Sequence, residues 1–197
     1  MASPTDTWLV VGLGNPGPAY ANTRHNVGQL VVDELAGRAS AAFKSHKAGA
    51  HVAEGRMRPG GPKLILAKSN GYMNTSGGPV SQLVKYFSLT PGQLIVVQDE
   101  IDIPFDSLKL KFGGGHGGHN GVRDIIKALG TGDFTRVRVG VGRPPGSTDA
   151  ADHVLKAFSA SERKNLPILI SDAADAVELI TTDGLNAAQL RFHTKTA

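Results

Sequence analysis

Short apolar runs alternate with segments of helical periodicity along this chain. A continuous apolar run predicts a buried strand, and apolar residues that recur every three or four positions predict a helix. The predicted strands cover residues 8–13, 51–57, 64–67, 94–97, 108–112 and 136–141. The predicted helices cover residues 26–38, 79–87, 161–182 and 186–193, and another begins at residue 121. Pro167 is a candidate break in the long helix.

This alternation predicts an α/β protein in which helices flank a mixed β-sheet. The length of 197 residues fits one domain, and residues 1–7 precede the first apolar run and are expected to be flexible. We find no internal repeat and no low-complexity tail.

Composition narrows the class of protein. Cysteine is absent, which excludes thiol catalysis, disulfides and thiolate metal sites and suits a cytoplasmic protein. The first residues lack the basic and apolar pattern of a signal peptide, and no apolar run approaches the ~20 residues of a membrane helix. We therefore expect no membrane association. The net charge of +4 is informative only if it gathers on one face.

The most unusual segment is residues 113–121, which read Gly-Gly-Gly-His-Gly-Gly-His-Asn-Gly. Glycine frees the backbone for positive φ and lets a substrate approach the main chain closely. The polar side chains left are His116, His119 and Asn120. A flexible linker is the alternative, but flexible linkers are rich in serine as well as glycine. The segment is better interpreted as a site between a strand and a helix.

A second glycine motif, residues 12–17, follows the first predicted strand and matches the dinucleotide-binding pattern G-x-G-x-x-G. In that fold a helix opens within the glycines. Here Pro16 and Pro18 hold the chain extended, and the helical pattern begins only after Thr23, which disfavours nucleotide binding. The polar residue of this loop is Asn15, at the carboxyl end of a strand, where open α/β sheets place their sites.

His25 is a candidate general base. Thr23 is a possible N-cap, which would place His25 in the first helical turn, where the positive helix end disfavours an imidazolium. An ordinary surface histidine is the alternative. Three carboxylates, Asp99, Glu100 and Asp102, follow an apolar strand. They are either solvated loop charges or, if the strands before His25 and Asp99 are neighbours, the source of a carboxylate that orients the ring, with Asp99 best placed.

Two further groups have candidate binding side chains. Tyr72, Met73 and Asn74 offer an aromatic ring, an apolar wall and an amide, although Thr75 or Ser76 beside them could simply cap a helix. Basic residues alternate along two strands, Lys109 with Lys111 and Arg136 with Arg138. Such pairs suit either phosphate groups or plain solvent.

Together these motifs strongly resemble bacterial peptidyl-tRNA hydrolases. The resemblance runs from about Leu9 to about Arg191, with every motif in the family's order. The motifs are residues 12–17, Tyr20, residues 23–26 (Thr-Arg-His-Asn), residues 72–74, residues 99–104 (Asp-Glu-Ile-Asp-Ile-Pro) and residues 113–121. The resemblance implies a monomeric esterase that needs no metal or other cofactor and has a twisted mixed sheet surrounded by helices. It also implies the reaction, which is cleavage of the bond between a peptide and the 3′ end of tRNA, so that tRNA is recycled.

The resemblance also implies roles for individual residues. His25 matches the catalytic base, Asp99 its supporting carboxylate, and Asn15 the residue that senses the acylated amino end of the substrate. Tyr72 stands where phenylalanine is common, a change that should preserve stacking. Which asparagine positions water and which stabilises the oxyanion is left open. The residues that match positions holding the tRNA 3′ end and the peptide are Tyr20, Tyr72, Asn74 and Asn120. Met73 and His119 are further candidates for substrate binding, and Lys109, Lys111 and Arg138 are expected to contact phosphates.

The residues fit this chemistry independently, because without cysteine or a G-x-S-x-G elbow a water activated by His25 is the economical nucleophile. Three alternatives remain. A metal hydrolase would use His25, His116, His119 and Asp99, although ligands on so many glycines would be poorly preorganised. A noncatalytic RNA-binding module would show no turnover, and a serine esterase would be labelled by an irreversible serine reagent.

Overall fold

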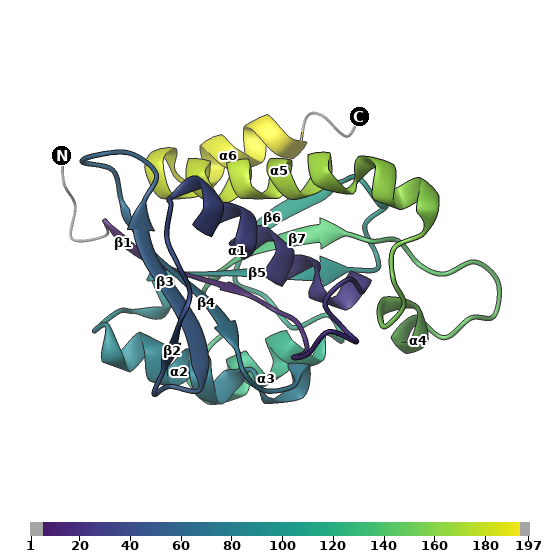
Figure 1. Cartoon of the computed structure of the whole chain (residues 1–197), viewed down its shortest axis with the longest axis horizontal. Helices are drawn as coiled ribbons and strands as arrows, with labels where there is room; N and C mark the ends of the chain where they lie inside the picture. Colours follow the sequence, from purple (N-terminus) through teal and green to yellow (C-terminus); the bar gives the residue numbers. More distant parts are fainter. Residues whose placement is uncertain (1–5, 194–197) are drawn as a thin grey trace.

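The computed structural model describes residues 6–193. Their backbone forms one seven-stranded mixed sheet with helices on both faces (Figure 1), as the sequence predicts. The expected flexibility of residues 1–5 lies outside the described residues, whereas Thr7 is already paired with Lys63. Along the chain the strands are β1 (Thr7–Gly12), β2 (Lys44–His46), β3 (Ala50–Arg56), β4 (Lys63–Ser69), β5 (Leu94–Glu100), β6 (Leu108–Phe112) and β7 (Thr135–Gly140).

The strand order is β2-β3-β4-β1-β5-β7-β6. The four central strands, β4, β1, β5 and β7, are parallel, and the outer strands pair antiparallel. The strands of residues 8–13 and 94–97 are therefore neighbours, which was the condition for a contact between His25 and Asp99. Because parallel strands end at one edge of the sheet, the loops after β1, β4 and β5 lie together.

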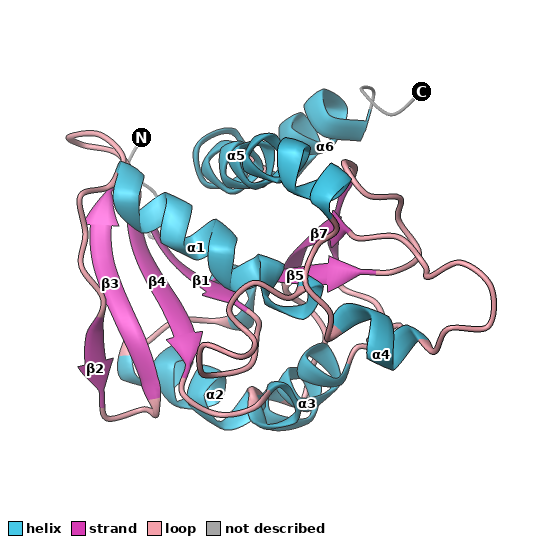
Figure 2. Ribbon diagram, turned by 45° about the vertical axis from the view of Figure 1, so that its right-hand side comes forward, coloured by secondary structure: helices cyan, strands magenta, loops and turns pink. Residues whose placement is uncertain are grey.

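The helices form two layers, which the two ribbon views show on opposite faces of the sheet (Figures 1 and 2). One hydrophobic cluster joins the sheet to α1, α5 and α6, and the other joins it to α2 and α3. A short helix, α4, stands apart at one end of the molecule (Figure 2). The bounds are α1 (Val27–Arg38), α2 (Gly77–Tyr86), α3 (Asn120–Leu129), α4 (Ala150–Val154), α5 (Ala160–Asp183) and α6 (Leu185–His193).

Close packing explains Gly12, in the motif of residues 12–17, and Gly28, in α1. A Cβ at Gly12 would lie 2.2 Å from the carbonyl oxygen of Gly28, and a Cβ at Gly28 would lie 2.2 Å from that of Val97. The two glycines let the first turn of α1 rest directly on the ends of β1 and β5. After β1 no helix starts until residue 24, so the chain lacks the strand–helix turn of a dinucleotide site, as predicted.

Several local expectations were wrong. Helix α5 continues through Pro167, an exposed residue, so water can replace the backbone hydrogen bond that the proline removes. Thr23 is the N-cap residue of a 3₁₀ turn, η1 (Arg24–Asn26), that contains His25, but its hydroxyl donates to the Tyr20 carbonyl and forms no capping bond. Helix α1 starts after that turn. Strand β2 and helix α4 have too little periodicity to be predicted.

No helix among residues 6–193 combines the length and the apolar composition needed to cross a membrane.

Candidate active site

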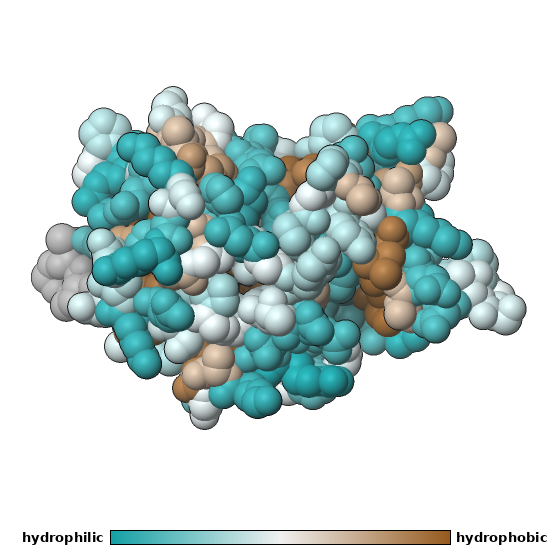
Figure 3. Space-filling model, turned by 60° about the horizontal axis from the view of Figure 1, so that its bottom comes forward, coloured by the Kyte–Doolittle hydropathy of each residue, from teal (hydrophilic) through white to brown (hydrophobic). Residues whose placement is uncertain are grey.

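A cleft of about 640 Å³ opens where the central parallel strands end. The loops after β1 and β4, the end of β5, the glycine-rich loop and α4 all contribute side chains to it. Figure 3 shows a hollow with a hydrophobic flank on the side of the molecule where α4 lies. Every motif of the sequence except Tyr20 contributes to the lining, with Asn15, His25, Tyr72, Met73, Asn74, Asp99, His119 and Asn120.

At the base of the cleft, the carboxylate of Asp99 binds two histidines. Oδ2 lies 2.8 Å from Nδ1 of His25, and Oδ1 lies 2.8 Å from Nε2 of His119. Asp99 is 3% exposed and lies in β5, not in the loop after it as the sequence indicated. The predicted contact between His25 and Asp99 is confirmed. The contact with His119 was not predicted.

The protonation of this group follows from its geometry. Burial acts to raise the pKa of Asp99, but the electrostatic attraction and the hydrogen bonds of His119 and His25 outweigh it and hold the pKa well below its usual range. An ionised carboxylate only accepts hydrogen bonds, so Nδ1 of His25 and Nε2 of His119 carry protons. In the neutral ring this arrangement places the lone pair of His25 on Nε2, which is the property a general base requires.

His119 differs from His25 because both of its nitrogens are occupied. It is the N-cap of α3, and its Nδ1 accepts hydrogen bonds from the backbone N–H groups of Gly121 and Val122 at 3.2 and 3.4 Å. His119 therefore has no free lone pair to act as a base. Its ring fixes the start of α3 and the position of Asp99 at the same time.

Asn15 is oriented by three hydrogen bonds. Its Oδ1 accepts from the backbone N–H of Met73 at 2.7 Å, and its main chain exchanges two bonds of 2.9 Å with the side chain of Asn26. The amide nitrogen of Asn15 is consequently the polar group that it offers to the cleft. The role of Asn26 was missed, since only the fold places these two loops together.

The remaining predicted residues surround the opening of the cleft. Asn74 and Asn120 are exposed, and Asn120 is the first residue of α3. Tyr72 is 57% exposed and packs edge-on against Tyr20, with ring centroids 6.2 Å apart. Met73 is buried beneath them at 4% exposure. Ser76, the alternative helix cap, precedes α2 without a side-chain capping bond.

Helix α4 forms an apolar wall that sequence analysis did not identify. The cleft is lined by Ala150, Ala151 and Val154 of this helix and by Leu155 directly after it. Five residues of helix give too short a periodic signal to recognise. The wall makes one side of the cleft suitable for apolar side chains.

The backbone of the glycine-rich loop has the freedom that its composition predicts. Gly113, Gly114, Gly117 and Gly118 all have positive φ, between 58° and 89°. A Cβ at Gly121 would lie 2.5 Å from Sδ of Met73, so α3 approaches the floor of the cleft closely. The loop is an ordered entry into α3 and not a linker. His116 does not contact Asp99, and its Nδ1 accepts from Gly118 N at 2.9 Å.

The four basic residues of β6 and β7 have different environments. Leu108 and Leu110 face the cluster beneath α5 and α6, so Lys109 and Lys111 face the other side of the sheet, as do Arg136 and Arg138 across the strand pair. Lys109, Lys111 and Arg138 reach the surface. Arg136 is 1% exposed and binds backbone carbonyls, so its predicted suitability for phosphates was wrong.

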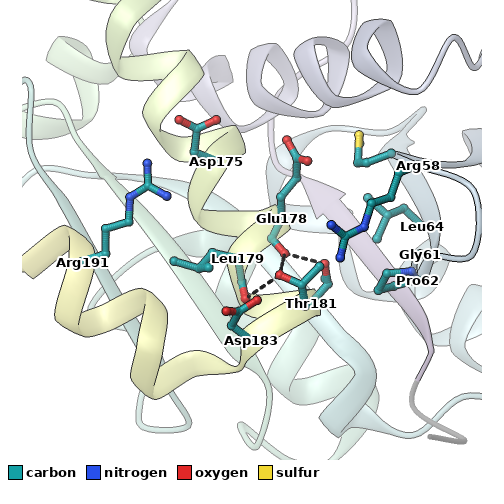
Figure 4. A pocket seen from close by; sticks show the side chains of 12 residues that line it. Arg58, Gly61, Pro62, Leu64, Asp175, Glu178, Leu179, Thr181, Asp183 and Arg191 are labelled. Atoms are coloured by element: carbon teal, nitrogen blue, oxygen red, sulfur yellow. Dashed lines mark hydrogen bonds between the residues drawn. The ribbon is translucent and has the colours of Figure 1, made fainter. Parts of the chain in front are cut away.

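The ligand atoms of His25, Asp99 and His119 lie within 4.8 Å of one another, a spacing that a metal ion could also use. Here the imidazole nitrogens facing Asp99 carry protons, and the hydrogen bonds account for the approach of all three groups. A second pocket, of about 370 Å³, shares no lining residue with the cleft. It lies beside the end of α5 and is lined by both acidic and basic side chains (Figure 4).

Comparison with known proteins identifies close relatives. The family described as Peptidyl-tRNA hydrolase matches residues 9–197. The peptidyl-tRNA hydrolase of Leifsonia xyli is 74% identical over 187 residues, which are 95% of this chain and 97% of the relative. That of an Arthrobacter strain is 63% identical over 190 residues, covering 96% and 98%.

A solved structure has the same fold. The crystal structure of peptidyl-tRNA hydrolase from Acinetobacter baumannii superimposes with a TM-score of 0.88 at 33% identity, covering 98% of this chain and 97% of that one.

Proposed function

We propose that His25 is the catalytic base of this chain, which belongs to the peptidyl-tRNA hydrolase family. As a member of that family it hydrolyses the ester bond between the peptide and the tRNA of peptidyl-tRNA. The observation that carries the proposal is the 2.8 Å bond from Nδ1 of His25 to Asp99. This hydrogen bond orients the His25 ring so that the lone pair of Nε2 faces the cleft.

The steps follow from this geometry. Nε2 of His25 takes a proton from a water molecule, whose oxygen attacks the ester carbonyl carbon. The imidazolium that forms is stabilised by Asp99. When the tetrahedral intermediate collapses, the bond to the ribose oxygen breaks and the imidazolium returns its proton to that oxygen. The products are the free peptide and tRNA, and the general-base step contributes about 10²–10⁴-fold.

The developing oxyanion requires hydrogen-bond donors near the reacting carbon. Asn74 and Asn120 both line the cleft and carry amide N–H₂ groups. Their positions support either assignment: one amide bonds the oxyanion while the other bonds the attacking water.

Asn15 supports discrimination between acylated and free amino groups. Since its Oδ1 is bound to Met73, it presents an N–H donor to the cleft. A peptide carbonyl accepts from that donor, whereas the α-ammonium group of aminoacyl-tRNA has only donors of its own. Ordinary aminoacyl-tRNA would thereby be spared.

The tRNA is held by stacking and by charge. Tyr20 and Tyr72 form an aromatic corner at the opening, suited to stack a base of the 3′ end. Met73 and His119 shape the floor of the cleft below this corner. On the β6–β7 face, Lys109, Lys111 and Arg138 contact phosphates, and the lowered pKa of Lys111, caused by burial and by the charges of Arg138 and Arg136, favours an anion there.

The enzyme acts as a cytoplasmic monomer that returns tRNA from prematurely released or stalled peptidyl-tRNA. Monomeric action is supported by the composition of the site, since one chain supplies the base, its carboxylate and the asparagines. The absence of cysteine suits the cytoplasm.

The test is His25→Ala with N-acetylaminoacyl-tRNA as substrate. Hydrolysis should fall by at least about 100-fold, since general-base catalysis is lost, while tRNA affinity and melting temperature change little. Unblocked aminoacyl-tRNA should be a poor substrate of the wild type, and chelators should not affect its rate. Substantial activity in the variant, or inactivation of the wild type by a chelator, would contradict the mechanism.

A further inference from the structure

Arg136, on β7, is a buried cation without a carboxylate partner. Its side chain is 1% exposed, and no acidic group among residues 6–193 lies within salt-bridge distance. Burial, and secondarily the charge of Arg138, lowers its pKa. A buried charge is costly unless surrounding groups compensate it, and such groups identify what the charge does.

Carbonyl oxygens supply the compensation. Nη1 of Arg136 donates to the carbonyl of Gly115, and Nη2 donates to those of Gly114 and Gly132 at 2.7 and 3.2 Å. The guanidinium carbon lies 4.6 Å from the ring centroid of Phe134. The planar fork of donors is therefore directed at backbone and held flat by an aromatic face.

The three carbonyls belong to two different loops. Gly114 and Gly115 lie in the glycine-rich loop that enters α3, and Gly132 lies in the turn that leaves it. The two loops touch, because a Cβ at Gly132 would lie 2.7 Å from the carbonyl oxygen of Gly114. Arg136 thus joins the loops at both ends of one helix.

The first residues of that helix are part of the site. His119 is the N-cap that binds Asp99, and Asn120 lines the cleft. We propose that Arg136 is a positioning residue for hydrolysis, which holds the two loops of α3 so that His119 and Asn120 keep their places. This inference rests on the mechanism proposed above, in which Asp99 and the asparagines act on the reacting ester.

Geometry separates this role from phosphate binding. The terminal donors of Arg136 already face carbonyls, and the side chain is covered, so no surface is left for a phosphate. Arg138, two residues along the same strand, is only half-buried. A change at Arg136 should therefore affect the chemical step, not the grip on tRNA.

The variant Arg136→Lys tests the proposal, because lysine keeps the charge but loses the planar fork. It should lower kcat about 10- to 100-fold, the effect of a displacement of about 1 Å at a reacting centre, and leave KM within about twofold. The loss should be equal for N-acetylaminoacyl-tRNA and for an N-acetylaminoacyl ester of a short oligonucleotide carrying the tRNA 3′ end. Added guanidinium should restore part of the activity of Arg136→Ala.

The matched control is Arg56→Lys, since Arg56 also holds a glycine carbonyl, that of Gly61, in a turn outside the cleft. It should leave kcat unchanged. A lower melting temperature of Arg136→Lys with normal kcat would reduce Arg136 to a structural role, and a raised KM confined to full-length tRNA would make it a phosphate ligand. Either result overturns the proposal. If His25→Ala stays active in the same assay, the proposed general-base mechanism is contradicted, and not only the role of Arg136.

Discussion

Asp99 is a buried carboxylate that two imidazole N–H groups keep ionised. Its low pKa shows that these partners more than offset the cost of burial. The carboxylate in turn fixes the tautomer of both rings, so one charge sets the proton positions of the whole group. Replacing it with an amide of equal size separates the effect of charge from the effect of shape.

Asp99→Asn should change the pH–rate profile in two ways. Protonated His25 loses its negative partner, so the acid limb should move to lower pH. The plateau should fall, by up to about 10⁴-fold as in triad enzymes, because an amide can hold the ring in the wrong tautomer. Rates measured from pH 4 to pH 9 at saturating substrate would show both.

The control for this variant is Asp102→Asn. Asp102 is exposed and pairs with Arg143 at 2.6 Å, away from both histidines, so its removal should leave the limb in place. A slower Asp99→Asn enzyme with an unmoved limb would mean that the carboxylate acts on the substrate instead.

The contacts of a site residue could be predicted from the sequence where that residue lies at the end of a strand or the start of a helix. Asp99 ends a buried strand and His25 precedes a helix, so their meeting followed from strand order. The second partner of Asp99, His119, was not predictable because the direction of a side chain in a glycine-rich loop depends on tertiary structure. Arg136 was misassigned because alternation gives the face of a strand and not the loop that covers it.

At the scale of elements, the turn that carries His25 is held by the neighbouring Arg24. Its guanidinium donates to the carbonyls of His153 and Lys156 and binds Glu162 at 2.7 Å. Glu162 also completes the capping box of α5 with Ser159. One ion pair therefore connects η1, α4 and the start of α5.

Glu162→Gln should destabilise the fold by about 1.5–3 kcal/mol at neutral pH, the range for a hydrogen bond to a charged group. Burial acts to raise the pKa of Glu162, but the Ser159 backbone and Arg24 outweigh it and lower the pKa. A carboxylate whose pKa is lowered by folding stabilises the protein at pH values above its pKa in the unfolded state. This contribution is lost as the pH falls through its pKa in the folded state.

Denaturant unfolding of wild type and Glu162→Gln at several pH values would measure this. The difference in unfolding free energy between wild type and Glu162→Gln should be largest at pH 7 and should disappear as the pH falls through the carboxylate range. A matched control is Glu54→Gln, since Glu54 forms an exposed pair with Lys63 and should contribute little. A gap that did not depend on pH would contradict a charge-based link.

Elements with long periodic patterns were predictable and short ones were not. Strands β1, β4 and β5 contain continuous apolar runs that predict them directly from the sequence, and the periodic pattern of α1 does the same. Strand β2 has three residues and α4 has five, so neither contains a full period to detect. Their positions depend on pairing with β3 and on the loop after β7.

For the whole molecule, the net charge of +4 is modest, and its distribution over the surface matters more than its size. Lys109, Lys111 and Arg138 lie on two paired strands and face one side of the sheet. Each contact with a phosphate releases counterions, so binding through them must weaken with salt.

Alanine at Lys109, Lys111 or Arg138 should each flatten the slope of log affinity against log salt by roughly 0.7–0.9. Filter binding or anisotropy with full-length tRNA between 50 and 300 mM salt would measure the slope. Lys164→Ala, on the opposite helical layer, should leave it unchanged. Equal slopes in all four variants would make the three residues ordinary surface cations.

The hydrogen bonds of Asp99 to His25 and His119 join the two helical layers across the sheet. His25 precedes α1, His119 begins α3, and Asp99 lies on the strand between them. A partly unfolded form that releases either layer would keep most of its secondary structure but would have no assembled base. We therefore expect activity to be lost on heating as soon as the less stable layer opens locally, before the chain unfolds globally.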